Sequence, residues 1–432
     1  VIKILIKENK KFRWLQKKKN LSDRQILKDI FFNSLQLADP LTKLTQIEFN
    51  KPKGRVFFAS VGKGAGRHAK AFSRNYSGLS EGVVVLPENE CCENIGYKVF
   101  KASHPVPSNS GLEASKYLLR EAKTLGKDDL FIFCISGGAS ALLPYPPEGF
   151  QLDDEIYLNK VLLSSGLSIK EMNVYRGAFS QIKAGKLAQM VYPCPIINLV
   201  VSDIPGDDIT LVGSGPTFIP RARLINSKIP KFGFKIEKYI NKILRSNSEE
   251  NICVNILNSY CLSSSKILFD EASNYIEKVL GLNSIILSSQ FEGDVNSLTR
   301  LYKNAIKDIS SPHSLIKKPA VILSGGEVEI KLPDCYGKGG RNSQFSLALS
   351  KEIDGMEGVT VLSADTDGID GNGENAGAIV DCSTFRSARK YFPEEDPVEL
   401  FDSYNIHKKL DTLFCTGPTG INLNDFRAAI VR

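Results

Sequence analysis

The chain of 432 residues carries a formal net charge of +7, from 55 Lys and Arg against 48 Asp and Glu. Eight of the basic side chains and only one acidic side chain lie in residues 1–20, so the remaining 412 residues hold 47 charges of each sign. We exclude nucleic acid as a partner because the body is neutral, and a membrane span because no apolar run approaches the ~20 residues that one needs.

The first half of the sequence alternates short apolar runs with helical patterns. The apolar runs predict buried strands at residues 56–60, 83–86, 130–135 and 196–201. Helical spacing predicts helices over residues 111–125, 153–163 and 168–190, the last opened by Ser168 and Glu171 at the spacing of a capping box. This alternation indicates an α/β fold with a largely parallel sheet.

A second, smaller α/β unit is predicted in the C-terminal part of the chain. Its strands are expected at residues 320–323, 328–332, 359–362, 377–380 and 413–415. The Lys-, Ile- and Ser-rich segment 227–251 separates the two parts. We therefore expect a basic tail at 1–20, an N-terminal domain at 21–250 and a C-terminal domain at 251–432.

Loops rich in glycine and polar residues follow six of the predicted strands. They cover residues 62–64, 136–140, 202–208, 324–327, 365–368 and 416–419. Ligands of open α/β sheets bind beyond the carboxyl ends of the strands, and backbone N–H groups at a following helix start attract anions. Because both halves contribute such loops, the sequence predicts an active site in a cleft between the two domains.

Each of these loops has a functional and a plain structural interpretation. Lys63 beside a helix start suits phosphate or carboxylate, although no Walker A spacing is present and a tight turn explains the same residues. Residues 136–140 lack the order of a nucleophile elbow, so they either cradle phosphate or form an ordinary turn. The carboxylates of residues 202–208 suit Mg²⁺ or a surface turn.

The C-terminal loops and the histidines also have a functional and a structural interpretation. Arg341 could hold a planar carboxylate or phosphate with two parallel hydrogen bonds, or belong to a flexible basic connection. Residues 365–371 lack the terminal Glu of a calcium loop, so calcium is excluded. His104 is expected to be structural rather than catalytic.

Taken together and in this order, the motifs resemble the glycerate 2-kinases whose C-terminal part is the MOFRL domain. The matching stretches are residues 61–65, 104–107, 136–142, 202–208, 214–217, 325–327, 337–342, 366–371, 376–378 and 416–422. The resemblance implies a two-domain α/β protein with a Rossmann-like N-terminal domain, and it places the MOFRL region at about residues 318–430. It also implies ATP-dependent, Mg²⁺-assisted phosphorylation of D-glycerate to 2-phospho-D-glycerate. The key lysine and arginine of the family match Lys63 and Arg341.

The motifs and the resemblance together give a set of expected site residues. Lys63, Arg341 and Asp203 are expected to be catalytic, and Asp203 with Asp208 to hold Mg²⁺. Substrate or nucleotide is expected to contact Gly62, Ser136, Gly137, Gly138, Ser140, Ser214, Gly215, Thr217, Glu327, Asn342 and Asp367.

Some features leave alternatives open. The sequence has Ser343 and Gln344 where the family usually has Gln-Glu, and Gly177 in a stretch that usually carries a basic pair. These departures leave a non-catalytic metabolite-binding paralogue as an alternative. A hydroxypyruvate reductase is a second alternative, because sequences of this kind sometimes carry that name, although the GxGxxG pattern of a dinucleotide site is missing. Nine scattered cysteines without a CxxC pair indicate a cytoplasmic protein, and the basic tail leaves a mitochondrial location as the alternative. Both a monomer and a homodimer fit the sequence.

Overall fold

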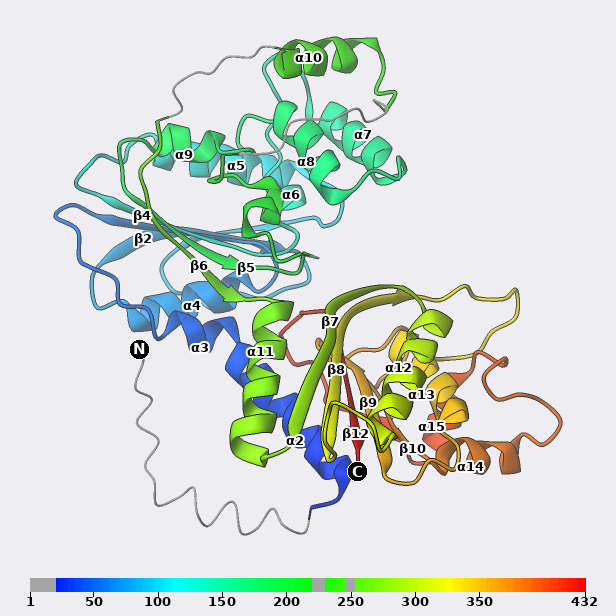
Figure 1. Ribbon diagram of the computed structural model, residues 1–432. Coiled ribbons are helices and arrows are strands. Elements are labelled where there is room, and N and C mark those ends of the chain that lie inside the picture. The colour runs from blue at the N-terminus through cyan, green and yellow to red at the C-terminus, as the bar shows by residue number, and fades with distance from the viewer. Residues whose placement is uncertain (1–20, 205, 220–229, 246–252) are drawn as a thin grey trace. The chain divides into compact units, whose positions relative to one another are not determined.

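The computed structural model describes residues 21–204, 206–219, 230–245 and 253–432 (Figure 1). The expected basic tail lies outside these residues. The chain divides into a first unit, Ala38–Ser264, and a second unit made of the residues up to Leu37 together with Ser265–Arg432.

The first unit begins and ends later in the chain than the N-terminal domain expected at residues 21–250. Helix α2 (Asp23–Ala38) packs almost entirely within the second unit, where the ring of Phe31 contacts Phe414 and Phe426 edge to face. Strand β6 (Ile256–Ser263) joins the sheet of the first unit. Position along the sequence does not predict the unit of either segment, because their apolar and hydrogen-bonding partners lie far away in the chain.

The first unit is built on a six-stranded parallel sheet in the order β3-β2-β1-β4-β5-β6. Its other strands are β1 (Val56–Val61), β2 (Ser80–Pro87), β3 (Lys98–Ala102), β4 (Leu130–Ile135) and β5 (Ile196–Val201). The strand predictions for β1, β2, β4 and β5 are confirmed. Each is an apolar run because both faces of a parallel sheet are covered: Phe57 faces one core cluster and its neighbour Phe58 the other.

Helices α3 to α10 and a 3₁₀ helix complete the first unit. They are α3 (Pro40–Leu44), α4 (Ala65–Asn75), α5 (Asn109–Ala122), α6 (Ala139–Leu142), α7 (Leu152–Leu163), α8 (Ile169–Ala178), α9 (Lys186–Val191), η1 (Ile209–Ser214) and α10 (Phe234–Arg245). The capping box of Ser168 and Glu171 is confirmed at the start of α8.

The prediction of one helix over residues 168–190 is wrong beyond Ala178. The hydroxyl of Ser180 accepts hydrogen bonds from the N–H groups of Ile182 and Lys183, which forms a turn. The Lys186 ammonium donates to the carbonyl oxygens of Gly177 and Ser180 and so closes the end of α8. Side-chain hydrogen bonds to the backbone thus interrupt an otherwise helical pattern.

The second unit is built on a mixed six-stranded sheet in the order β11-β10-β9-β12-β8-β7, in which only β7 and β8 run parallel. The strands are β7 (Asn283–Asp294), β8 (Ala320–Glu329), β9 (Val359–Asp365), β10 (Gly377–Asp381), β11 (Leu413–Phe414) and β12 (Asp425–Val431). Its remaining helices are α11 (Ser265–Tyr275), the π-helix η2 (Ile276–Leu280), α12 (Val295–Ser310), α13 (Arg341–Glu352), α14 (Thr384–Tyr391) and α15 (Ser403–Lys409).

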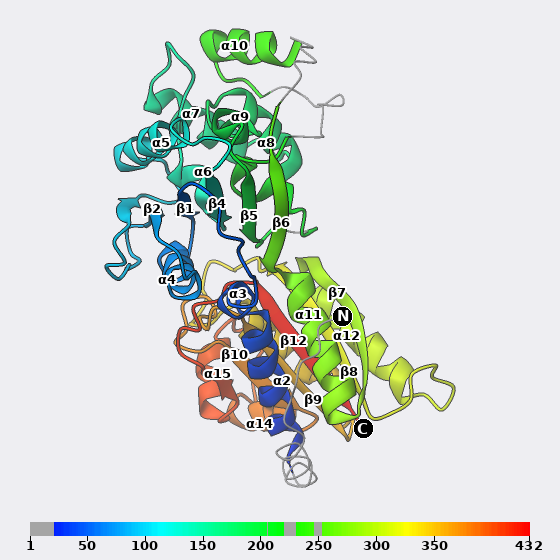
Figure 2. The ribbon, with the colours of Figure 1, turned by 90° about the vertical axis from the view of Figure 1, so that its left-hand side faces the viewer.

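The two faces of this second sheet are covered by different helices. Helices α2 and α11 lie side by side on one face (Figure 2), where the ring of Phe269 stacks on Phe426. Helices α12 and α13 close the other face around Tyr302 and Phe345. Within the described ranges, no helix is both long and apolar enough to cross a membrane.

One loop expected in the second unit is absent. Residues 320–323 and 328–332 were predicted as separate strands, but β8 runs without a break from Ala320 to Glu329 and includes the supposed loop 324–327. Two register shifts in the pairing of β8 with β7 accommodate the consecutive glycines there. Glu327 therefore projects from a strand rather than from a loop.

Candidate functional site

The first polar centre, which consists of Lys63, His104 and Asp203, lies in the first unit beyond the carboxyl ends of its strands. Strands β1, β3, β4 and β5 are parallel, so the loops that follow them emerge at one edge of the sheet. The amide N–H of Lys63 donates to the carbonyl oxygen of Gly137 at 2.9 Å, and the hydroxyl of Ser136 donates to the carbonyl oxygen of Lys63 at 2.7 Å. The loops after β1 and β4 are thereby joined.

Two glycines allow the other side chains of this centre to approach the backbone. A Cβ atom on Gly137 would lie 2.0 Å from Oδ2 of Asp203, and one on Gly138 would lie 2.9 Å from Cδ2 of His104. Gly62 is equally close to Ser136, whose Oγ would be 2.2 Å from an added Cβ. The expected residues Gly62, Lys63, Ser136, Gly137, Gly138 and Asp203 are therefore brought together. His104, expected to be structural, lies among them.

Burial and charge shift the pKa values of this centre. Burial raises the pKa of Asp203, although Lys63 and His104 oppose the shift. Burial and the nearby Lys63 lower the pKa of His104, while Asp203 opposes this. Lys63 and His104 thus favour the charged carboxylate of Asp203 against its burial, whereas burial and Lys63 favour the neutral imidazole of His104 against the charge of Asp203.

Replacing Gly137 with alanine is expected to displace Asp203 and to reduce turnover by at least about tenfold, because a misplaced reacting group loses its alignment. Gly126→Ala is the matched control, since its added Cβ meets only Asp129 Oδ2, at 3.9 Å. Steady-state kinetics and thermal unfolding of both variants check the prediction. A Gly137→Ala protein with the kinetics of the control would contradict the described position of Asp203.

The start of helix α4 differs from the expected anion site. The N–H of Gly64 donates to Oε2 of Glu90 at 2.8 Å, so a carboxylate of the chain itself occupies this position. The side chain of Lys63 is exposed. A phosphate could therefore bind the Lys63 ammonium directly, whereas it could bind the Gly64 N–H only after the Glu90 carboxylate has left that group.

A chain of hydroxyl groups links the two serine-containing loops of the first unit. Ser140 Oγ lies 3.0 Å from Ser214 Oγ, which donates to Oδ1 of Asn173 at 2.9 Å. The carbonyl oxygens of Ser214 and Gly215 accept the N–H groups of Ala184 and Gly185, respectively. Gly215 and Thr217 are buried in this turn rather than presented to solvent. Sequence reasoning missed Asn173, which carries no local signal in the middle of a helix.

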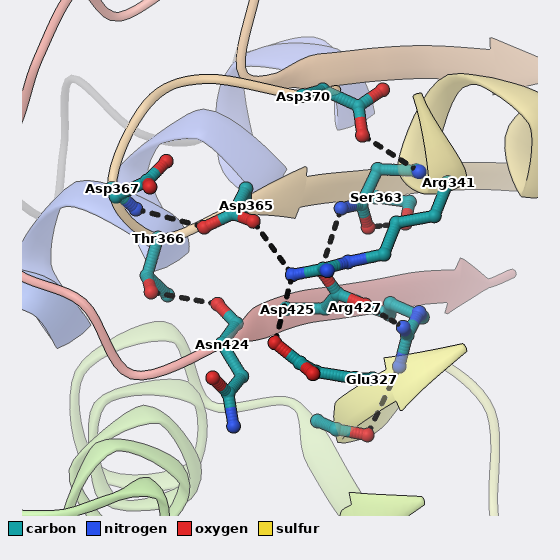
Figure 3. Close-up of polar contacts among 12 residues, drawn as sticks. Glu327, Arg341, Ser363, Asp365, Thr366, Asp367, Asp370, Asn424, Asp425 and Arg427 are labelled. Atoms are coloured by element: carbon teal, nitrogen blue, oxygen red, sulfur yellow. Dashed lines mark hydrogen bonds and ion pairs between the residues drawn. The ribbon is translucent and has the colours of Figure 1, made fainter. Parts of the chain in front are cut away.

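The second polar centre surrounds Arg341, the first residue of α13, and comprises Glu327, Arg341, Asp365, Asp425 and Arg427 (Figure 3). Arg341 donates from Nε to Oδ1 of Asp425 at 2.7 Å and from Nη2 to Oδ2 of Asp365 at 2.8 Å. Nη2 also lies 3.2 Å from Oε1 of Glu327. Three carboxylates, from strands β8, β9 and β12, thus converge on one guanidinium group.

A second guanidinium group balances part of this negative charge. Arg427 is completely buried and bonds to Asp425 Oδ2 and, at 3.0 Å, to the carbonyl oxygen of Gly325. Asn342 donates to Asp425 Oδ1 at 2.7 Å. Asp425 is therefore held from three sides.

Asp365 has an unusual protonation equilibrium. Burial, followed by the negative charges of Asp425 and Asp367, raises its pKa to about 8, although Arg341 opposes the shift. For Arg341 itself, burial acts to lower the pKa, but the charges of Asp425, Asp365 and Glu327 outweigh it and raise the pKa. The guanidinium group therefore stays charged, while the carboxyl of Asp365 titrates near neutral pH.

A carboxylate of the chain accepts the N–H groups at the start of α13, as Glu90 does at the start of α4. Asp370 accepts the N–H groups of Asn342 and Ser343 and the Ser343 hydroxyl, at 2.6 to 2.9 Å. Asp367 accepts the N–H of Ile369, and its own N–H donates to Asp365 Oδ1 at 3.1 Å. The expected residues Glu327, Arg341, Asn342 and Asp367 do gather here, with Asn342 buried as a support.

Sequence reasoning missed the roles of Asp425 and Arg427. A charged pair in the otherwise apolar strand β12 was the available signal, because a buried charge in a central strand requires a partner.

The expected metal ligands of the first unit are only partly available. The Asp208 carboxylate accepts the N–H and the hydroxyl of Thr210 and so caps the 3₁₀ helix η1. Among the residues that the structure describes, no group of three or more His, Cys, Asp or Glu is arranged to hold a metal ion. Within the described part of the same loop, Asp203 caps no helix, and Mg²⁺ commonly binds through one or two carboxylates plus substrate phosphates.

The sequence is similar to two protein families and to several curated proteins. A profile described as "Domain of unknown function (DUF4147)" matches residues 26–229, and the "MOFRL family" profile matches residues 320–425. A D-glycerate 2-kinase of Thermotoga maritima is 31% identical over 87% of this chain and 91% of its own length. A putative hydroxypyruvate reductase of Agrobacterium vitis is 33% identical over 88% of this chain and its entire length.

A solved structure supports the same relationship. The crystal structure of a glycerate kinase from Thermotoga maritima matches with a TM-score of 0.82 and 29% identity, over 94% of this chain and 99% of that one. The α/β fold with a parallel first sheet and a C-terminal MOFRL domain is thereby confirmed. The chain belongs to the glycerate 2-kinase family whose C-terminal part is the MOFRL domain.

Proposed function

We propose that the protein is an ATP-dependent kinase that phosphorylates D-glycerate to 2-phospho-D-glycerate. The observation that carries the proposal is the exposed ammonium of Lys63 beside the carboxylate of Asp203, in a chain whose relatives include named D-glycerate 2-kinases. Phosphoryl transfer needs positive charge around the transferred group and a group that takes the proton of the attacking hydroxyl.

The roles follow from this chemistry. The C2 hydroxyl oxygen of glycerate attacks the γ-phosphorus of ATP, the bond from that phosphorus to the bridging oxygen breaks, and ADP leaves. Lys63 offsets the charge on the transferred phosphoryl oxygens. Asp203 accepts the hydroxyl proton.

The remaining proposed contacts belong to both units. Arg341 holds a carboxylate or phosphate oxygen of the substrates, with Glu327, Asn342 and Asp367 around it. The polypeptide turn from Ser136 to Gly138, with Gly62 beside it and the linked Ser140 and Ser214 behind it, cradles the nucleotide phosphates. Gly215 and Thr217 act through the turn that holds Ser214.

Mg²⁺ is the proposed metal of this reaction. Asp203 is the ligand proposed for it, because no hydrogen bond found among the described residues makes its carboxylate a helix cap, whereas Asp208 would have to release Thr210. The ion would supply charge neutralisation on the phosphates.

Substituting Arg341 with lysine is expected to lower kcat/KM by about a hundredfold. A single ammonium cannot replace a planar group that reaches Asp425 and Asp365 at once and still offers an edge to an anion. Arg386→Lys is the matched control, because Arg386 makes an exposed pair with Asp354. Equal kinetics of the two variants would remove Arg341 from the proposed site.

The alternative function is reduction of hydroxypyruvate, because two of the relatives from Agrobacterium vitis carry that name. One experiment separates the two activities: ADP release is measured with ATP, Mg²⁺ and D-glycerate, and NADH oxidation with hydroxypyruvate. The kinase proposal expects ADP release that depends on D-glycerate. NADH oxidation without ADP release would establish the alternative, and binding of D-glycerate with neither turnover would establish a non-catalytic protein.

A further inference from the structure

The second polar centre contains more negative than positive charge around a residue expected to bind an anion. Glu327, Asp365 and Asp425 contact Arg341, whereas Arg341 and Arg427 supply the positive groups. With every group ionised, the centre carries one excess negative charge, and Asp367 adds another close by. An oxyanion that approaches Arg341 therefore meets repulsion as well as attraction.

The hydrogen bonds indicate which carboxylate can give up its charge. Asp425 is fully buried and bonds to both guanidinium groups and to Asn342, so its negative charge is compensated on all sides. Glu327 has a side-chain exposure of 55%, so water stabilises its charge. Asp365 has an exposure of only 10% and a single guanidinium partner. A proton on Asp365 is therefore the least costly way to neutralise the centre.

The same side chain lies where an incoming anion would act on it. Asp365 shares Nη2 of Arg341 with Glu327, and 28% of the Arg341 side chain is exposed. No hydrogen bond to Nη1 of Arg341 is found within the described ranges, so this edge is available to a ligand oxygen. A carboxylate or phosphate bound there would stand next to Asp365.

We propose that Asp365 is a positioning residue that must carry a proton when Arg341 binds the oxyanion of a substrate, so that binding above neutral pH takes up a proton from solution. This inference rests on the proposed function and specifies how that site is regulated. The charged groups that face Asp365 are Arg341 from α13, Glu327 from β8, Asp425 and Arg427 from β12, and Asp367 from the following loop. Because Arg341 and Arg427 supply only two positive charges to the three contacting carboxylates, a proton on Asp365 removes the excess negative charge that would repel the ligand.

The direction of the pH effect follows from the raised pKa of Asp365, about 8. Below that value the free protein already carries the proton, and affinity does not depend on this group. Above it the free protein has an ionised Asp365, and an anion binds only together with a proton. The dissociation constant then rises by up to about tenfold for each pH unit.

Isothermal titration calorimetry of the full chain tests this directly. D-Glycerate and, in a second arm, a non-hydrolysable ATP analogue are titrated at about pH 7 and about pH 9 in buffers of different ionisation enthalpy. For one of the two ligands, binding is expected to be accompanied by uptake of about one proton by the protein at the higher pH and of almost none at the lower pH. Proton uptake in the titration with D-glycerate would indicate that a carboxylate binds Arg341, and uptake in the titration with the ATP analogue would indicate a phosphate.

Two variants separate this role from a structural one. Asp365→Asn imitates the protonated carboxyl, so it is expected to bind with the same affinity at both pH values and without proton uptake. Asp354→Asn, which removes the carboxylate of an exposed arginine pair, is expected to keep the wild-type pH dependence. If Asp365→Asn does not fold, the pH dependence of the wild-type uptake still decides: a midpoint at about pH 8 supports Asp365, and uptake that is absent at about pH 9 overturns the inference.

The same titrations distinguish failure of this inference from failure of the proposed kinase function. Binding of D-glycerate and of the analogue without proton uptake at either pH would overturn this inference and leave the kinase proposal intact. Absence of binding by both ligands would overturn the two together. Proton uptake that persists in Asp365→Asn would assign the proton to another group and also contradict the inference.

Discussion

Replacement of Lys63 with alanine is expected to lower kcat for phosphorylation of D-glycerate by about a thousandfold, with little change in stability. The ammonium is exposed at the ends of the parallel strands, and the backbone of Lys63 is fixed to Gly137 and Ser136 independently of its side chain. The turn therefore survives the substitution, whereas the charge that faces the transferred phosphoryl group is lost.

The matched control for this result is Lys127→Ala, which removes another exposed lysine of the same unit. Initial rates of ADP release at saturating ATP and D-glycerate measure kcat, and circular dichroism confirms that each variant is folded. A folded Lys63→Ala protein that retains the kcat of the control would show that Lys63 is not part of the machinery.

The second large effect is expected on stability, from a buried ion pair between α7 and the turn before α9. Lys183 and Glu155 have side-chain exposures of 0% and 2%, and the Lys183 ammonium bonds to Oε1 of Glu155. Lys183→Met leaves a buried carboxylate without its partner, which is expected to lower the free energy of unfolding by about 3–5 kcal/mol. Urea denaturation followed by circular dichroism measures the change.

Two further variants test the cause of that loss. Glu155→Gln combined with Lys183→Met removes both charges of this pair and is expected to recover much of the stability, because neither member is left ionised without the other. Lys116→Met breaks the exposed pair with Glu113 and is expected to cost less than about 1 kcal/mol. A Lys183→Met protein as stable as Lys116→Met would mean that Glu155 does not depend on Lys183.

The strands that could be predicted are those buried on both faces. The apolar runs of β1 and β4 are completely buried, and they stand out in the sequence because helices cover both sides of a parallel sheet. The edge strands β3 and β6 carry exposed polar residues and were missed. Strand β12 was missed as well, since Asp425 and Arg427 interrupt its apolar pattern.

The candidate site was predictable only as far as the direction of the strands determines it. Parallel strands bring their carboxyl ends together, so the association of Lys63, Ser136 and Asp203 follows from the strand assignments alone. The partners of Arg341 come from strands distant in sequence, and no local pattern specifies such pairing. The same holds for Glu90 and Asp370, which fill the two helix starts from separate loops.

The most direct test of the proposed function is a ³¹P NMR spectrum of the full chain incubated with ATP, Mg²⁺ and D-glycerate. The spectrum identifies both the phosphoryl donor and the position of the product phosphate in one measurement. We predict that the γ-phosphate signal of ATP declines as the signal of 2-phospho-D-glycerate grows in equal amount. The signal of a phosphomonoester on the C3 oxygen would contradict the proposed product. ATP that persists while no phosphoglycerate signal grows would contradict the proposed kinase activity.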